Sequence, residues 1–240
     1  MRRWAVATVA AMLSVAGSSD VAHAQQSRGQ EQQGKQLPRQ TTVPVAEQHT
    51  RAQQQKVQVT QYKQHLGKQL PVIQHQTAQL ATQKRTAQYR VQQQYAAKLR
   101  EQETHLQTTR NFATDPYVRT PANYRYVISG TTRETNQYGA AMLREAVNDG
   151  YKQGYLAGQA DRSDRWKADY QDSPAYIDAN YGYTGNYVPQ GDYNYYFREG
   201  FQRGYGDAYN GRLQYGQDSG TNYSILSSVL TGILGLSPIG

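Results

Sequence analysis

Small residues recur at every fourth position in one stretch of the chain, and bulky residues recur beside them. The small row is Ala146, Gly150, Gly154 and Gly158, and the bulky row is Leu143, Val147, Tyr151 and Tyr155. A spacing of four places side chains on one face of an α-helix. Each glycine inside a helix costs about 1 kcal/mol relative to alanine. We therefore expect a second helix to pack closely into this groove of small residues.

The same arrangement returns 50 residues later in Gly200, Gly204 and Ala208. The bulky row beside them is Phe197, Phe201, Tyr205, Tyr209 and Leu213. We interpret this as an internal duplication of one helix and expect the two copies to pack together. A Thr-x-x-Glu capping box at Thr131–Glu134 predicts the start of the first helix, and Asp192 is the expected N-cap of the second. The pattern resembles the glycine-zipper segments of bacterial envelope proteins, over these two stretches alone.

A different period runs through residues 50–110, which are rich in glutamine, alanine and other good helix formers. Apolar residues recur there at intervals of seven, then of four, and finally of seven again, at Leu66, Ile73, Leu80, Ala87, Val91, Tyr95, Leu99 and Leu106. This predicts a coiled-coil-like amphipathic helical segment, broken or kinked at Pro71. Its stripe could form a coiled coil, pack on the second half, lie on an anionic surface, or belong to a solvated helix.

The remaining segments give shorter signals. Residues 124–128 are typical of a single strand, Ser163–Trp166 could open a short helix, and Ser173-Pro174 predicts another that runs through Ala179. Residues 180–191 read as a tyrosine-rich loop. The segment 217–240 is uncharged from Tyr223 onward and predicts an apolar helix and tail that docks on the domain, mediates self-association or lies on a bilayer surface.

The N-terminus has the layout of a secretory signal. A basic start at Arg2-Arg3 and an apolar run to Val15 precede small residues around Ala24. We expect residues 1–24 to be a signal peptide cleaved after Ala24, which indicates a periplasmic or extracellular protein. The run is too short to span a bilayer, so we do not expect a transmembrane protein. Residues 25–49 have almost no apolar content and are expected to form a disordered, glutamine-rich linker.

Composition divides the chain near residue 110. Residues 25–110 carry 13 Lys+Arg against 4 Asp+Glu, whereas residues 111–240 carry 11 against 13. Eighteen of the 21 tyrosines follow residue 110, so tyrosine rings must supply much of the core and their hydroxyls need partners. We therefore expect a mainly α protein: a long basic helical extension at 50–110 and a small Tyr/Gly-rich helical domain at 111–216 with two glycine-faced helices packed together.

Catalytic chemistry is not indicated. The chain has no cysteine, which excludes thiol catalysis and cysteine-ligated metals. The histidines after the signal, His49, His65, His75 and His105, show no metal-ligand spacing. Asp161, Asp164, Asp169 and Asp172 do not match a calcium loop, and we interpret them as a surface charge network with Arg162, Arg165 and Lys167. We expect no enzyme, catalytic residue, metal or cofactor.

Two functions fit these patterns. The first is an exported, non-catalytic cell-envelope protein that contacts a protein, an envelope polymer or an anionic surface, or that self-associates. The second is a glycan- or peptidoglycan-binding module in which aromatic rings stack on sugars: Trp166, Tyr181, Tyr183, Tyr187, Tyr193, Tyr195 and Tyr196. The alternative is that these rings are buried and form the core of the domain. Nucleic acid is not an expected partner, because the basic segment lacks interleaved stacking aromatics.

Overall fold

The computed structural model describes residues 42–106, 108–218 and 223–239. The predicted signal peptide and residues 25–41 of the predicted linker lie outside these ranges. The described part is mainly helical, with small antiparallel sheets, so the mainly α class is confirmed. Among the described residues, no helix combines the length and the apolar character that crossing a membrane requires.

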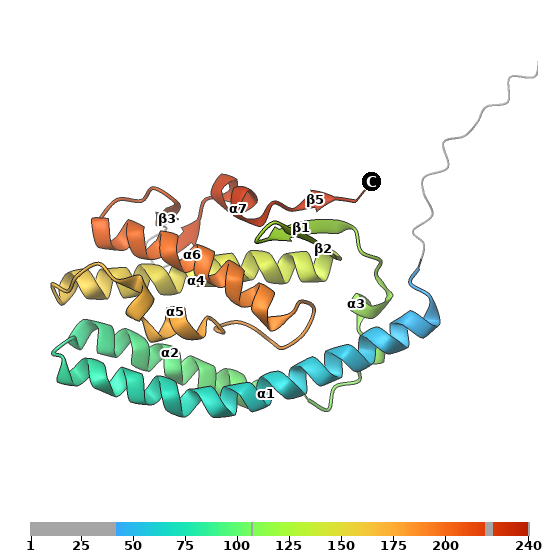
Figure 1. The fold of residues 1–240 in the computed structure, drawn as a ribbon, viewed down its shortest axis with the longest axis horizontal. Coiled ribbons are helices and arrows are strands. Elements are labelled where there is room, and N and C mark those ends of the chain that lie inside the picture. Colours follow the sequence, from blue (N-terminus) through green and yellow to red (C-terminus); the bar gives the residue numbers. More distant parts are fainter. Residues whose placement is uncertain (1–41, 107, 219–222, 240) are drawn as a thin grey trace, which may run out of the picture. The chain divides into compact units, whose positions relative to one another are not determined.

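Two long helices form a hairpin from the basic first half (Figure 1). They are α1 (Val45–Thr82) and α2 (Thr86–His105), and the turn between them contains Lys84 at a φ of 60°. α1 begins at Val45, inside the range that we expected to be disordered. The hairpin contacts the second half through α4 and α5. It is therefore not an extension that projects from the domain.

Pro71 does not break α1, so the predicted break is wrong. The helix continues from Val45 to Thr82 with Pro71 inside it. Proline removes one backbone donor, which leaves the carbonyl of Gly67 without its usual partner. Pro71 is exposed, and water can satisfy that carbonyl. Burial of Leu70 and Ile73 on the opposite face holds both halves of the helix in register.

The predicted capping box is a strand instead. β1 (Tyr124–Ile128) pairs in antiparallel register with β2 (Thr131–Thr135), and β5 (Ser237–Pro238) adds to the other side of β1. Ser129 and Gly130 both have a positive φ, which suits a tight hairpin turn. The expectation of an unpaired strand at 124–128 is therefore wrong as well.

α4 (Gln137–Ser163) begins after the sheet, and Asn136 is its N-cap, accepting hydrogen bonds from two backbone amides. α6 (Gln190–Asn210) runs parallel to α4, and the two helices lie side by side (Figure 1). Pro189 is the N-cap of α6, so the prediction for Asp192 is wrong. Asp192 lies in the first turn, where its buried carboxylate accepts hydrogen bonds from Tyr126 and Arg133.

Short elements join the long ones. They are η1 (Phe112–Thr114), α3 (Pro116–Arg119), η2 (Tyr170–Asp172), α5 (Pro174–Asp178), β3 (Gly216–Asp218), β4 (Tyr223–Ile225) and α7 (Ser227–Leu234). The short helix expected after Ser173 is confirmed as α5, with Ala179 as its C-cap. No helix opens at Ser163, because α4 continues to that residue. α7 docks on α4 and α6 and buries Leu234.

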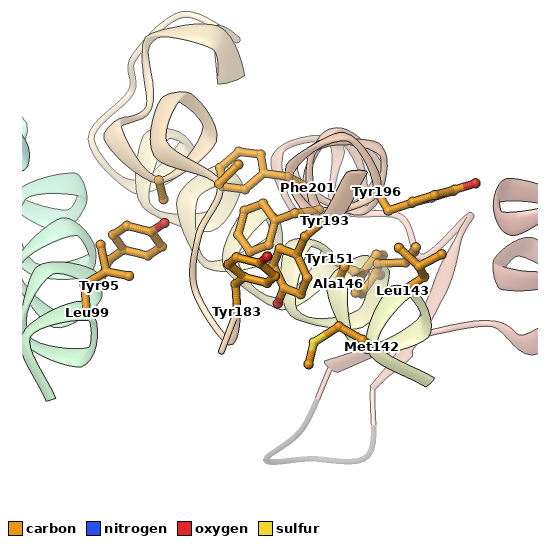
Figure 2. Close-up of a cluster of buried hydrophobic side chains, with 14 of the residues drawn as sticks. Tyr95, Leu99, Met142, Leu143, Ala146, Tyr151, Tyr183, Tyr193, Tyr196 and Phe201 are labelled. Carbon is orange, nitrogen blue, oxygen red and sulfur yellow. The ribbon is translucent and has the colours of Figure 1, made fainter. Parts of the chain in front are cut away.

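Tyrosine and phenylalanine rings fill much of the core (Figure 2). The fully buried large side chains include Tyr62, Tyr95, Tyr151, Tyr183, Tyr193, Tyr196, Phe197 and Phe201. Each of these tyrosine hydroxyls donates to a carbonyl or carboxylate oxygen. Burial without such a partner would cost roughly 1–3 kcal/mol for each hydroxyl. A tyrosine-based core is therefore stable here because the hydroxyls of these six buried tyrosines are all paired.

Candidate functional site

The glycine rows of α4 and α6 face each other's backbone. A Cβ added at Gly150 or Gly154 would lie 2.7 Å from the carbonyl carbon of Phe197 or Phe201, respectively. A Cβ at Gly204 would lie 2.8 Å from the carbonyl carbon of Tyr151. Such distances are far inside van der Waals contact, so only glycine fits at these positions.

The contacts of the two helices are reciprocal. Gly158 faces the backbone of Tyr205, and Gly200 faces that of Val147. The 50-residue offset exchanges Val147 with Phe197 and Gly200 with Gly150. It therefore converts the contact of Val147 with Gly200 into the contact of Phe197 with Gly150, so the interface has local two-fold character. Ala208, at the end of the second row, is buried. The interface brings two backbones together and leaves no space for a ligand between them.

Glutamine side chains attach the hairpin to the second half. Gln102 donates to the carbonyls of Asn180 (3.0 Å) and Tyr183 (2.7 Å) and accepts from the backbone amide of Gly182 at 2.9 Å. Gln92 accepts from the amide of Ala175 at 3.1 Å. These side-chain amides form hydrogen bonds with backbone N–H and C=O groups of the loop that have no partner in a helix or a sheet. The glutamine-rich composition therefore serves docking as well as solubility.

A buried ion pair strengthens the same interface. Arg85, in the turn between α1 and α2, lies 2.6 Å from Asp161 on α4, and both side chains are buried. Burial raises the pKa of Asp161, although Arg85 and the Tyr205 hydroxyl oppose that shift. The Asp164 carboxylate accepts from two amides in the first turn of α2, at 2.9 Å each. Negative charge is favourable at this position because helix N-termini carry unpaired donors.

The expected surface charge network is thus partly wrong. Asp161 and Asp164 are occupied by the hairpin and not by the neighbouring arginines. Lys167 does pair with Asp169 and Asp172, at 2.8 and 3.8 Å. In the described ranges, no group of three acidic, histidine or cysteine side chains is placed to hold a metal ion.

The outer face of the hairpin is basic. Between Val45 and Leu106 the chain has nine Lys+Arg and three Asp+Glu. Arg85, Arg51 and Lys98 each pair with an acid. The other cations have no ion-pair partner in the part of the chain that the structure describes: Lys56, Lys63, Lys68, Lys84, Arg90 and Arg100. Glu103 is the acid that remains unpaired among the described residues of this hairpin.

The aromatic residues expected to stack on sugars do not form one platform. Tyr183, Tyr193 and Tyr196 are at most 1 % exposed and belong to the core, so the prediction is wrong for these three rings. The others are half-buried and dispersed: Tyr181 beside Tyr95, Tyr187 beside Tyr117, Tyr195 beside Tyr196, and Trp166 under Arg85. Residues 180–189 are a loop that closes the core against α1 and α2, and residues 190 and 191 already belong to α6.

Asp149 is a titratable group that the sequence pattern did not single out. It lies on α4 near Gly182 and the hydroxyl of Tyr193. Burial raises the pKa of its carboxyl to about 6, Glu145 adds to the shift, and Lys152 opposes it.

The fold and this surface define a mainly helical protein that has a glycine-packed helix pair, a tyrosine core and a basic hairpin face. No protein-family model matches the chain. The searches of curated proteins and of solved structures likewise find no match. Function must therefore be argued from the chain's own residues.

Proposed function

We propose that this chain is an exported, non-catalytic cell-envelope protein that binds an anionic surface through the outer face of its α1–α2 hairpin. The N-terminal signal layout supports export. The observation that carries the binding role is the group of six cations on the hairpin that have no ion-pair partner among the described residues. Polybasic clusters bind anionic surfaces with about 1 kcal/mol for each cation near the surface.

The arrangement of the acids supports this assignment. The second half has slightly more acids than bases. Two of its acids, Asp161 and Asp164, are used to dock the hairpin. The six unpaired cations stay exposed or partly exposed on the docked hairpin. A folded surface of this kind loses less conformational entropy on binding than a disordered basic tail would.

We further infer that α4 and α6 arose by duplication of one glycine-faced helix and act as the rigid support for the hairpin. Their reciprocal backbone contacts support this inference. A support in which two backbones touch cannot slide without steric overlap, so the hairpin is held at a fixed orientation. Self-association through this interface is not part of the proposal, because both glycine rows are already occupied.

Co-sedimentation with lipid vesicles tests the proposed function. The full chain should pellet with phosphatidylglycerol vesicles at low salt. It should be released at high salt, because salt screens the attraction between exposed charges. It should not pellet with phosphatidylcholine vesicles. Replacing Lys56, Lys68 and Arg90 with glutamine should abolish most of the pelleting. All three side chains are exposed and unpaired, so the fold should be unaffected.

A matched control removes the same charge elsewhere. Arg119, Arg162 and Arg165 are also exposed, lie outside the hairpin, and have no ion-pair partner among the described residues. Their triple glutamine variant should pellet like the original chain. Equal loss of binding in the two variants would show that only net charge matters and would remove the hairpin from the proposal.

A further inference from the structure

A groove lies on the far side of α6 from its glycine row, and the proposed function does not use it. Its volume is about 460 Å³, within the roughly 300–1,000 Å³ of small-molecule pockets. Three segments form it: the C-terminal half of α6, Ala168 and Tyr170 at the start of η2, and the chain that follows α6. The residues that the argument uses are Tyr170, Gln202, Tyr209, Asn210, Arg212 and Tyr215.

Three half-buried tyrosine rings line the groove, and neighbouring groups fix two of them. The Tyr209 ring stacks on that of Tyr205, with 5.8 Å between centroids, and its hydroxyl donates to the carbonyl of Trp166. Arg203 lies over the Tyr215 ring at 5.9 Å. Rings held in this way lose little conformational freedom when a ligand binds.

Asp207 builds one wall of the groove. Its buried carboxylate accepts from the Tyr151 hydroxyl at 2.8 Å and from the backbone amides of Gln214, Tyr215 and Gly216 at 2.9, 2.9 and 3.1 Å. These four bonds turn the chain back after α6 and place residues 214 and 215 beside the helix. Because its oxygens already accept four hydrogen bonds, the carboxylate has a structural role in this wall.

The rest of the lining is polar and nearly uncharged. Arg203 pairs with Glu199 at 2.8 Å. The side-chain amides of Gln202, Asn210 and Gln214 are exposed and make no hydrogen bond within the described chain. Arg212 is likewise exposed and unpaired there. The groove therefore combines aromatic surface with amide donors and acceptors, and it lacks a large net charge.

We propose that this groove binds a saccharide. A sugar ring has an apolar C–H face that packs on tyrosine and hydroxyls at its edge that exchange hydrogen bonds with amides. The aromatic side chains and the amides of this groove match both parts. The site differs in its position from residues 181–196, and in its chemistry from the basic hairpin, where charge and not ring contact would drive binding.

Isothermal titration calorimetry of the full chain with neutral trisaccharides tests the proposal, using the N-acetylglucosamine trimer, maltotriose and cellotriose, with trigalacturonate as the acidic member. At least one should bind, and binding of a neutral sugar should be insensitive to salt. The variants Tyr215→Ala and Asn210→Ala/Arg212→Ala should each weaken it about tenfold or more, since buried polar contacts discriminate strongly. Asn210 and Arg212 are exposed, so the double variant separates binding from folding.

Two controls keep this test independent of the proposed function. Gln94→Ala, an exposed amide on α2, should leave sugar binding unchanged, and so should the hairpin triple variant. The groove variants should still pellet with anionic vesicles. The saccharide site would be overturned if none of the four sugars bound, or if both groove variants bound sugar as tightly as the original chain. Either result would leave the hairpin proposal standing.

Discussion

Replacing Gly154 with alanine adds a single methyl group where the backbones of α4 and α6 are in close contact. That methyl would lie 2.7 Å from the carbonyl carbon of Phe201 and 2.8 Å from its Cα. Ordinary carbon–carbon contacts lie at about 3.5–4.0 Å. The two helices must therefore separate by roughly 1 Å at this point, and backbone atoms, unlike side chains, cannot rotate out of the way.

Two effects of opposite sign decide the result. Alanine favours the helix by about 1 kcal/mol relative to glycine. Overpacking a close-packed core typically costs about 1–3 kcal/mol, and more where the backbone is the obstacle. Separation would also loosen Tyr151 and Phe201, which are fully buried on the two helices. With the upper end of that cost, which applies because the obstacle is backbone, we expect a net destabilisation of about 2 kcal/mol, a large share of a typical stability of about 5–15 kcal/mol.

Chemical denaturation monitored by circular dichroism measures this difference, and Gly206 supplies the matched control. Gly206 lies on α6, and a Cβ added there would meet no atom within 4 Å. Gly206→Ala should therefore stabilise the protein by up to about 1 kcal/mol through helix propensity alone. Similar free energies of unfolding for Gly154→Ala and Gly206→Ala would refute the close-packed interface.

Three further predictions concern Asp149 and two residues that attach the hairpin to the second half, Asp161 and Gln102. Burial raises the pKa of the Asp149 carboxyl to about 6, so the folded state keeps its proton to a higher pH than the unfolded state does. The free energy of unfolding should therefore fall as pH rises from about 4 to 6. Asp149→Asn should remove this pH dependence and add up to about 3 kcal/mol at pH 7 in denaturation curves. Asp161→Ala leaves Arg85 buried without its partner and should cost about 3–5 kcal/mol by thermal unfolding. Gln102→Ala should cost roughly 2 kcal/mol in urea titrations because it frees several loop groups, whereas Gln94→Ala should change nothing measurable.

Local sequence patterns were informative where one face of a helix packs on one neighbour. The four-residue spacing of glycine indicates close backbone approach without any knowledge of the fold, since glycine is otherwise unfavourable in a helix. The seven-residue spacing identified Leu66, Ile73 and Leu80, which are all buried. It missed the buried amides Gln88 and Gln92, because polarity alone assigns glutamine to the solvent side.

Long-range partners account for the errors. A capping box and a strand compete for Thr131–Glu134, and pairing with β1 decides in favour of the strand. Asp164 caps α2 although 76 to 77 positions separate it from the amides it binds. No local pattern encodes such a contact. The groove beside α6 was missed because its rings come from three segments and, unlike the tyrosines at 181–196, do not cluster in the sequence.

Sedimentation with purified cell-wall sacculi at low and high salt tests most directly the claim that the basic hairpin binds the envelope. We expect the original chain and the Arg119/Arg162/Arg165 control to pellet at low salt and to be released at high salt. The Lys56/Lys68/Arg90 variant should remain in solution at both. Pelleting of that variant to the same extent as the original chain, or no pelleting of any form, would contradict the account.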